Sequence, residues 1–228
     1  MHPEKKSYLE TMIAKDIICN NFPVLQPNDN CEKAIDLMTE FNVAEIPIVS
    51  RASTWVYAGR AGAELFDVPI SEIKTMHEPV SVLEQTHIFE IIKVFVNSKL
   101  TLMPVVDGNA NYIGTITIKE LFQAFADISS LDEPGGILVL EMTNRDYSLA
   151  EIARICENNN AKIICAYANV FPDENRMEVT LKLNRQNLSD VIANLERYDY
   201  VITSTFQESE YTQDLKERYD SLMKYLDI

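Results

Sequence analysis

The side chains able to ligate a metal ion or to act as nucleophiles are few in this chain, and their spacing favours neither role. They are His2, His77, His87, Cys19, Cys31, Cys156 and Cys165. No CxxC pair occurs, and no histidine is spaced i, i+4 from another histidine or from a cysteine. We therefore expect no metal centre. Cys31 and Cys156 lie among aliphatic residues on predicted helix faces, where a thiol behaves as a small buried hydrophobic group.

Known catalytic patterns and the signs of a polyanionic partner are also missing from the sequence. It contains no nucleophile elbow, P-loop or Rossmann glycine pattern, so we do not expect an enzyme. Residues 1–135 carry 10 Lys and Arg against 19 Asp and Glu, and residues 136–228 carry 10 against 16. No basic stripe is present to neutralise phosphates, which argues against binding to nucleic acid or to an anionic membrane.

Composition and targeting signals indicate a soluble globular protein. The hydrophobic and charged fractions are 46% and 24%, as in ordinary globular domains. No apolar stretch is long enough for a membrane helix, and the first residues lack an apolar signal segment. A cytoplasmic location is the expectation.

An internal repeat organises the first half of the chain. Residues 24–49 and 81–106 superimpose without a gap at an offset of 57, which places Pro47 on Pro104. The segment ahead of each proline repeats an apolar stripe with the i, i+3, i+4, i+7 spacing of an amphipathic helix. The stripe comprises Cys31, Ala34, Ile35 and Met38 in the first copy and Ile88, Ile91, Ile92 and Phe95 in the second. Such a repeat predicts two similar modules that pack together and leave clefts between them.

Each module is expected to contain the same order of elements. The first module comprises residues 1–75 and opens with a segment at 12–18. Its predicted elements are a helix that runs from an N-cap at Asp29 to Phe41, two strands at 46–49 and 55–58, and a second helix from about Ala63. The second, residues 76–128, is predicted to contain helix 87–98, strands 103–106 and 112–117 around an Asp107-Gly108-Asn109 turn, and helix 118–127.

The second half has a different pattern after a linker at 129–136 that is rich in small and breaker residues. Residues 137–228 are predicted to form strands at 137–142, 162–171, 177–183 and 200–206, with a turn at 172–175. The strand at 177–183 alternates apolar and polar residues. Three helices are predicted: one capped by Ser148 with Leu149 on its buried face, one around 188–195 and a terminal one at 209–226. The β-α-β-β-α-β order is that of a ferredoxin-like domain. The terminal helix either caps the sheet or forms a dimer seam.

The repeat resembles a cystathionine-β-synthase (CBS) domain pair. The resemblance rests on Ile46-Pro47-Ile48-Val49, on Met103-Pro104-Val105-Val106 and on the segment Gly114 to Glu120. Residues 137–228 resemble an ACT domain, and the whole order is similar to acetoin-utilisation B type accessory proteins. The resemblance implies an α+β fold, a Bateman-type module followed by a ferredoxin-like domain, and a regulatory rather than enzymatic role.

The same resemblance implies a ligand of the adenosine type in the cleft between the repeats. The implied binding residues are Val82, Met103, Pro104, Thr117 and Glu120 in the second module and Pro47, Arg60 and Gly62 in the first. In the family, a Gly-x-x-Ser/Thr-x-x-Asp segment places a hydroxyl near the ligand and a carboxylate on the ribose diol. Thr117 fits this pattern and Glu120 keeps the charge with one extra methylene, whereas Gly62 stands where the first module needs a hydroxyl.

The candidate cations near the module ends are scattered, and they are Arg51, Arg60, Lys99 and Lys119. A triphosphate needs several cations or a metal, so AMP, adenosine or a similar adenine compound is expected rather than ATP. In the ACT-like half, Tyr147 or Ser148 replaces the glycine that amino-acid-binding ACT domains carry after the first strand, so assembly is expected there rather than effector binding. Tyr147, Tyr198 and Tyr200 are expected to supply core or interface area.

Two functions remain open from the sequence. In the first, a homodimeric regulatory protein senses an adenine compound through its CBS-like pair, and the ACT-like part relays the state to an unknown target or holds the assembly. In the second, the clefts are empty and the protein is an oligomerisation or scaffold module.

Overall fold

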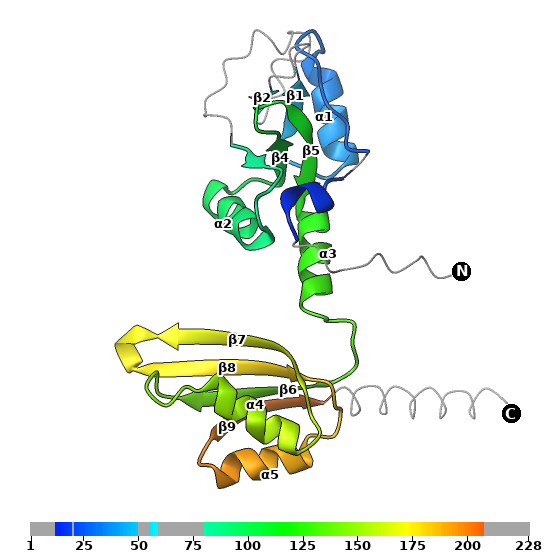
Figure 1. The fold of residues 1–228 in the computed structure, drawn as a ribbon. Helices are drawn as coiled ribbons and strands as arrows, with labels where there is room; N and C mark the ends of the chain where they lie inside the picture. The colour runs from blue at the N-terminus through cyan, green and yellow to red at the C-terminus, as the bar shows by residue number, and fades with distance from the viewer. Residues whose placement is uncertain (1–11, 20, 50–54, 59–79, 208–228) are drawn as a thin grey trace, which may run out of the picture. The chain divides into compact units, whose positions relative to one another are not determined.

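The protein is described here from a computed structural model that places residues 12–19, 21–49, 55–58 and 80–207. The chain divides into two compact units, Met1–Phe125 and Ala126–Ile228 (Figure 1). The mixed α+β class expected from the sequence is confirmed. The helices predicted from Ala63 and at 209–226 lie outside the described residues.

The first repeat forms one helix and a two-stranded sheet. A 3₁₀ turn (η1, Ala14–Asp16) precedes helix α1 (Cys31–Glu40), and strand β1 (Ile46–Val49) pairs antiparallel with β2 (Trp55–Ala58). The predicted N-cap at Asp29 is wrong, because the side chain of Asn30 accepts the hydrogen bond from the Lys33 amide at 3.1 Å. The Asp29 carboxylate instead accepts from the backbone amide of Gln26 at 2.7 Å and thereby closes the preceding turn.

The second repeat follows the predicted order closely. Strand β3 (Val82–Leu83), helix α2 (Ile88–Ser98), strand β4 (Leu102–Val106), strand β5 (Tyr112–Thr117) and helix α3 (Ile118–Ile128) follow one another along the chain. Their sheet has the order β3-β4-β5, with β3 parallel and β5 antiparallel to β4. The Asp107 carboxylate accepts from the amides of Asn109 and Asn111, both at 2.8 Å, and so stabilises the predicted turn between β4 and β5.

The strand pairing repeats with the offset seen in the sequence. A parallel bridge joins Leu25 to Ile48, and the parallel pair Val82–Val105 lies 57 residues further along. The antiparallel partner of Pro47 is Tyr57, whereas that of Pro104 is Thr115, so the offset becomes 58 beyond the turn. The duplication is therefore structural, and the two repeats differ by one residue in the turn between their antiparallel strands.

The ends of the two repeated helices correspond as well. Asn30 caps α1, and His87 caps α2 by accepting from the Phe89 amide at 3.3 Å. Beyond the helices, Asn42 and Lys99 both adopt the left-handed conformation, with φ of 52° and 56°. Both pairs are again 57 residues apart, so the helices begin and end at equivalent positions with different side chains.

The two repeats share their hydrophobic cores. One cluster gathers Phe22, Leu25, Cys31, Ala34, Ile46 and Ile48 of the first repeat, and it also includes Leu102 of the second. The other cluster gathers residues of β3, α2, β4, β5 and α3. A strand that contributes its alternate side chains to both cores holds the two modules together.

The opening segment at 12–18 packs against the second repeat, although the sequence assigned it to the first. Ala14 is fully buried in the second repeat's core, and its amide donates to the Thr86 carbonyl at 2.8 Å. Ile18 lies against Gly114, where a Cβ would come within 2.3 Å of its methyl group. The glycine is therefore required for close packing of this segment on β5.

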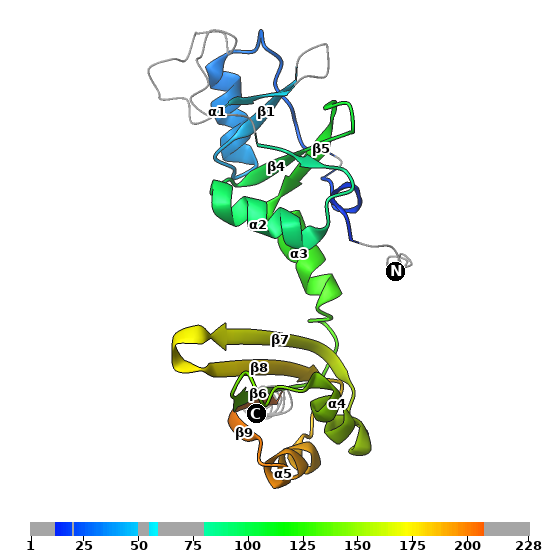
Figure 2. The same ribbon diagram turned by 60° about the vertical axis from the view of Figure 1, so that its left-hand side comes forward.

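The second unit contains one four-stranded antiparallel sheet. Its elements are β6 (Gly136–Met142), α4 (Leu149–Asn158), β7 (Ile163–Phe171), the 3₁₀ turn η4 (Pro172–Glu174), β8 (Arg176–Leu183), α5 (Ser189–Arg197) and β9 (Val201–Gln207). The predicted β-α-β-β-α-β order is found, and the strands lie in the order β7-β8-β6-β9. In both views the two helices lie on one face of the sheet (Figure 2).

The core of the second unit lies between the sheet and its helices. The alternation predicted for β8 is confirmed, since Met177, Val179, Leu181 and Leu183 are buried and the residues between them are half-buried. Ser148 caps α4 as predicted, with its hydroxyl accepting from the Glu151 amide at 3.3 Å. Leu149 was expected on the buried face but is 41% exposed, and it is the first residue of α4, directly after the cap.

Candidate functional site

The residues predicted to bind a ligand in the CBS-like pair have very different surroundings. The side chains of Val82 and Met103 belong to the second repeat's core, with exposures of 6% and 0%. Pro47 and Pro104 are buried within β1 and β4. Arg60 and Gly62 lie outside the described residues. Of the described positions, Val82, Met103 and both prolines are thus buried and present little side-chain surface.

Thr117 and Glu120 are brought together at the junction of β5 and α3. Thr117 ends the strand, and Glu120 lies in the first turn of the helix that follows directly. The Thr117 hydroxyl donates a short hydrogen bond to the Glu120 carboxylate, and both residues are half-buried. A carboxylate that accepts one hydrogen bond retains further lone pairs, so the pair still presents acceptors to a diol. The structure thus brings Thr117 and Glu120 into direct contact.

Two of the four candidate cations of the first unit lie among the described residues. Lys99 and Lys119 are both exposed, one at the end of α2 and the other in the first turn of α3. Arg51 and Arg60 lie outside the described residues.

A buried carboxylate that the sequence did not single out joins the two repeats. Glu45 is only 7% exposed and accepts from the Thr101 amide at 2.9 Å and from the Thr101 hydroxyl. That hydroxyl also accepts from the Ala44 amide at 2.8 Å. Ala44 and Thr101 occupy equivalent positions of the two repeats. From the sequence, Glu45, just before β1, would be expected to be exposed to solvent. Only the packing of the second repeat against it shows that it is buried.

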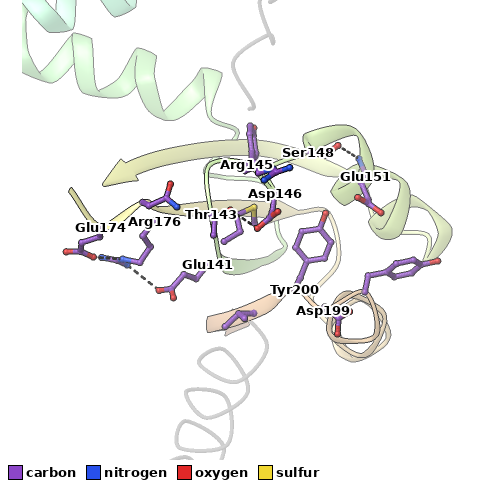
Figure 3. A pocket seen from close by; sticks show the side chains of 15 residues that line it. Glu141, Thr143, Arg145, Asp146, Ser148, Glu151, Glu174, Arg176, Asp199 and Tyr200 are labelled. Atoms are coloured by element: carbon purple, nitrogen blue, oxygen red, sulfur yellow. Dashed lines mark hydrogen bonds and ion pairs between the residues drawn. The ribbon is translucent and has the colours of Figure 1, made fainter. Parts of the chain in front are cut away.

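The second unit contains a cavity of about 860 Å³ at one end of its sheet (Figure 3). Its walls come from the end of β6, the turn at 143–148, the hairpin between β7 and β8, and the loop between α5 and β9. The charged residues that line it are Glu141, Arg145, Asp146, Glu151, Glu174, Arg176 and Asp199, together with three tyrosines, Tyr147, Tyr198 and Tyr200. The volume is in the range of small-molecule sites.

The sequence identified only one wall of this cavity. The turn at 143–148 was considered as an effector site, but hairpin residues 174–176 follow it by 26 to 33 residues and loop residues 198–201 by 50 to 58, and nothing in their composition shows that they meet. The signal available was the combination of acid and tyrosine in Asp146-Tyr147 and Tyr198-Asp199-Tyr200. Tyr147 and Tyr200 do pack against the core as expected, yet Tyr198 is 44% exposed.

Arg176 is the best-paired charge in the cavity wall. Its guanidinium donates to Glu174 at 2.8 Å and to Glu141 at 3.3 Å, and it also contacts Glu178. The same group lies 4.1 Å from the centre of the Phe171 ring. The hydrogen bond that Arg176 donates to Glu174 is the main cause that raises the pKa of Arg176. Its positive charge is therefore already balanced by carboxylates of the protein.

The remaining candidates for reactive chemistry are structural. Cys31 and Cys156 are buried, as predicted, and burial raises the pKa of both thiols, that of Cys156 to about 11. A thiol with a raised pKa is a poor nucleophile at neutral pH. Across the part of the chain that is placed, no group of three or more His, Cys, Asp and Glu is arranged to hold a metal ion. No helix of that part is both long and apolar enough for a membrane span.

Comparison with known proteins places one family in the first unit. Residues 70–127 match the family described as the CBS domain. This stretch contains β3, α2, β4, β5 and most of α3, which are the elements of the second repeat. The second repeat is therefore similar to a CBS domain, as the resemblance of Met103-Pro104-Val105-Val106 and Gly114 to Glu120 predicted.

Solved structures similar to this chain include proteins named for their CBS domains. A CBS domain pair/ACT domain protein from Thermotoga maritima is 16% identical, with 51% of this chain and 98% of that chain covered and a TM-score of 0.46. CBSX2 in complex with AMP is 19% identical, with 51% and 98% covered and a TM-score of 0.44. A protein from Methanocaldococcus jannaschii is 23% identical, with 54% and 62% covered and a TM-score of 0.44.

Proposed function

We propose that this protein is a regulatory protein whose duplicated first unit binds an adenine compound of the AMP or adenosine type. Its second unit, with the strand order β7-β8-β6-β9 of a ferredoxin-like domain, is in this proposal an ACT-like domain that relays the bound state or holds the assembly. A ligand shifts the equilibrium between two arrangements of a regulatory protein only if it binds one arrangement more tightly than the other.

One observation carries the proposal: the family match of residues 70–127 falls on a structural repeat that ends in the Thr117–Glu120 pair. The pair occupies the start of α3, where negative charge is favoured and where hydroxyl donors of a sugar find a carboxylate acceptor.

Isothermal titration calorimetry of the full chain with AMP, adenosine and ATP tests this proposal. We expect AMP or adenosine to bind at least as tightly as ATP, because the candidate cations are few, those described are exposed, and the chain carries a net charge of −15. Each additional phosphate charge therefore meets repulsion that few cations offset. ATP binding at least tenfold tighter than AMP would contradict the proposed ligand class.

Replacing Glu120 with glutamine tests the site itself. A hydrogen bond to a charged acceptor contributes about 1.5–3 kcal/mol, so Glu120→Gln is expected to weaken AMP binding roughly 10- to 100-fold. Glu90→Gln is the matched control, because Glu90 has the same third position in α2 and its exposed carboxylate pairs only loosely with Lys93 at 3.7 Å. Equal affinities of the Glu120 and Glu90 variants would exclude Glu120 from the site.

The proposed homodimer has a candidate surface on the first unit. Helices α2 and α3 cover the same core, yet each carries large apolar side chains on its outer face. Phe89 and Val96 are 57% and 70% exposed, and Ile118 and Phe122 are 51% and 69% exposed. The two helices contain two basic and three acidic residues, so this face is nearly neutral in a strongly acidic chain. A second copy meets the least charge repulsion here.

The expected result is a dimer of about twice 26.0 kDa in light scattering coupled to gel filtration. The double variant Val96→Glu with Phe122→Glu is expected to be a monomer, because it buries four like charges in the interface. Leu149→Glu, at an apolar residue that is 41% exposed in the second unit, is expected to leave the dimer intact. A dimer that survives the double variant would place the interface elsewhere.

The scaffold alternative is favoured by one contact. The hydrogen bond between the Thr117 hydroxyl and the Glu120 carboxylate forms within the protein itself. The junction of β5 and α3 therefore needs no ligand to pair these two groups. A dimer that gives no binding heat with AMP, adenosine or ATP would support the scaffold and overturn the sensor.

A further inference from the structure

The cavity of the second unit is acidic and aromatic at once. Its lining contains five carboxylates against two guanidinium groups, a net charge of −3. Three tyrosines from two separate loops complete the wall. Carboxylates and electron-rich ring faces both attract cations, and both repel anions.

The positive charges of the wall are already engaged or exposed. Arg176 is held by Glu141, Glu174 and Glu178, so it has little capacity left for a carboxylate or phosphate of a ligand. Arg145 is exposed on the turn that follows β6. Just outside the lining, Arg154 lies 3.8 Å from the Glu151 carboxylate and 5.4 Å from the centre of the Tyr198 ring. A cation therefore already packs on one of the cavity's tyrosines.

Two carboxylates of the wall have no cationic partner among the placed residues. Asp146 accepts only from the Thr143 hydroxyl at 2.6 Å, and no ion pair involves Asp199. Figure 3 shows Asp146 and Glu151 on either side of the Tyr200 phenol, with Asp199 in the adjoining loop. Burial, followed by the charge of Glu151, raises the pKa of Tyr200. The phenol therefore stays neutral and its ring stays electron-rich.

We propose that this cavity binds an aliphatic polyamine, held by ammonium groups on Asp146 and Asp199 and by methylene groups against Tyr198 and Tyr200. An ammonium group has three donors and no acceptor, which matches carboxylates that lack a cationic partner. A flexible amine with two or more charges spans carboxylates on different loops, and an open cavity of about 860 Å³ accommodates it. A free α-amino acid fits less well, because its carboxylate meets five carboxylates of the wall, and Arg176 is already paired, which leaves Arg145 on the exposed turn as the remaining guanidinium.

Calorimetry of the full chain with spermidine at 150 mM salt tests the site, and it does not depend on adenine binding by the first unit. The double variant Asp146→Asn with Asp199→Asn is expected to bind spermidine at least tenfold more weakly. Both changes are nearly isosteric, and asparagine suits the left-handed backbone of Asp199, whose φ is 63°. Tyr200→Leu is expected to weaken binding about threefold or more, whereas Tyr200→Phe retains it.

The matched control removes the same two charges from the same unit outside the cavity. Asp173 and Asp190 are exposed and do not line it, so Asp173→Asn with Asp190→Asn is expected to change the affinity less than twofold. Equal weakening by both double variants would overturn the proposal, because binding would then be diffuse attraction to an acidic chain. Glutamate binding as tightly as spermidine would also overturn it.

Discussion

Replacing Leu181 with alanine is expected to destabilise the second unit by about 2–5 kcal/mol, the usual cost of truncating a fully buried leucine. Leu181 is 0% exposed and lies in β8, between β7 and β6. Its side chain packs in the cluster that joins the sheet to α4 and α5. The structure around a central strand relaxes little, so most of the cavity left by the three lost carbon atoms persists.

The measurement is backbone hydrogen exchange of the β6 and β8 amides, which reports the opening free energy of this sheet. Thr180→Ala is the control, because Thr180 is the neighbouring residue on the opposite, half-buried face of the strand. We expect it to cost less than about 1 kcal/mol. Similar effects of the two changes would contradict the alternation assigned to β8.

Replacing Thr101 with valine is expected to destabilise the first unit by about 2–4 kcal/mol. The variant keeps the shape of the side chain but removes the hydroxyl that donates to the buried Glu45 carboxylate. It also leaves the Ala44 amide without its 2.8 Å acceptor. Two polar groups at the contact of the repeats thus lose a partner in one substitution, and one of them is charged.

Urea unfolding followed by tryptophan fluorescence measures this effect, since Trp55 is the single tryptophan of the chain and lies in β2 of the first unit. Thr101→Ser retains the hydroxyl and is expected to cost less than about 1 kcal/mol. Thr39→Val removes an exposed hydroxyl that bonds only to its own helix, at the Ile35 carbonyl, and should change stability little. If Thr101→Val left the free energy of unfolding unchanged, Glu45 would have to gain another hydrogen-bond donor in the variant.

Local sequence patterns predicted the elements because their physical causes are local. The apolar stripe of α2, the Asp107 turn and the alternation of β8 each depend on residues within one or two turns of the chain. The same holds for the Ser148 cap. The choice between Asp29 and Asn30 as the cap of α1 was wrong, because both residues can accept an amide hydrogen bond and only the position of the first helical turn decides between them.

The two candidate sites differ in the same way, since one depends on neighbouring residues and the other on distant segments. Thr117 and Glu120 are three residues apart across a strand–helix junction, so their contact follows from the sequence. The cavity of the second unit, by contrast, gathers side chains from four segments that are separated by up to 60 residues. Its acidic and aromatic character appears only after β6, the β7–β8 hairpin and the α5–β9 loop end at the same edge of the sheet.

By itself the sequence determined the duplication, since an offset of 57 residues recurs in side chains, in helix caps and in strand pairing alike. Tertiary structure alone decided that residues 12–19 pack on the second repeat, that Glu45 is buried against Thr101 and that the second unit has a cavity. The physical reason is the range of the interactions. Periodicity and capping act within a few residues, whereas burial and charge depend on which distant segments fill the space around a side chain.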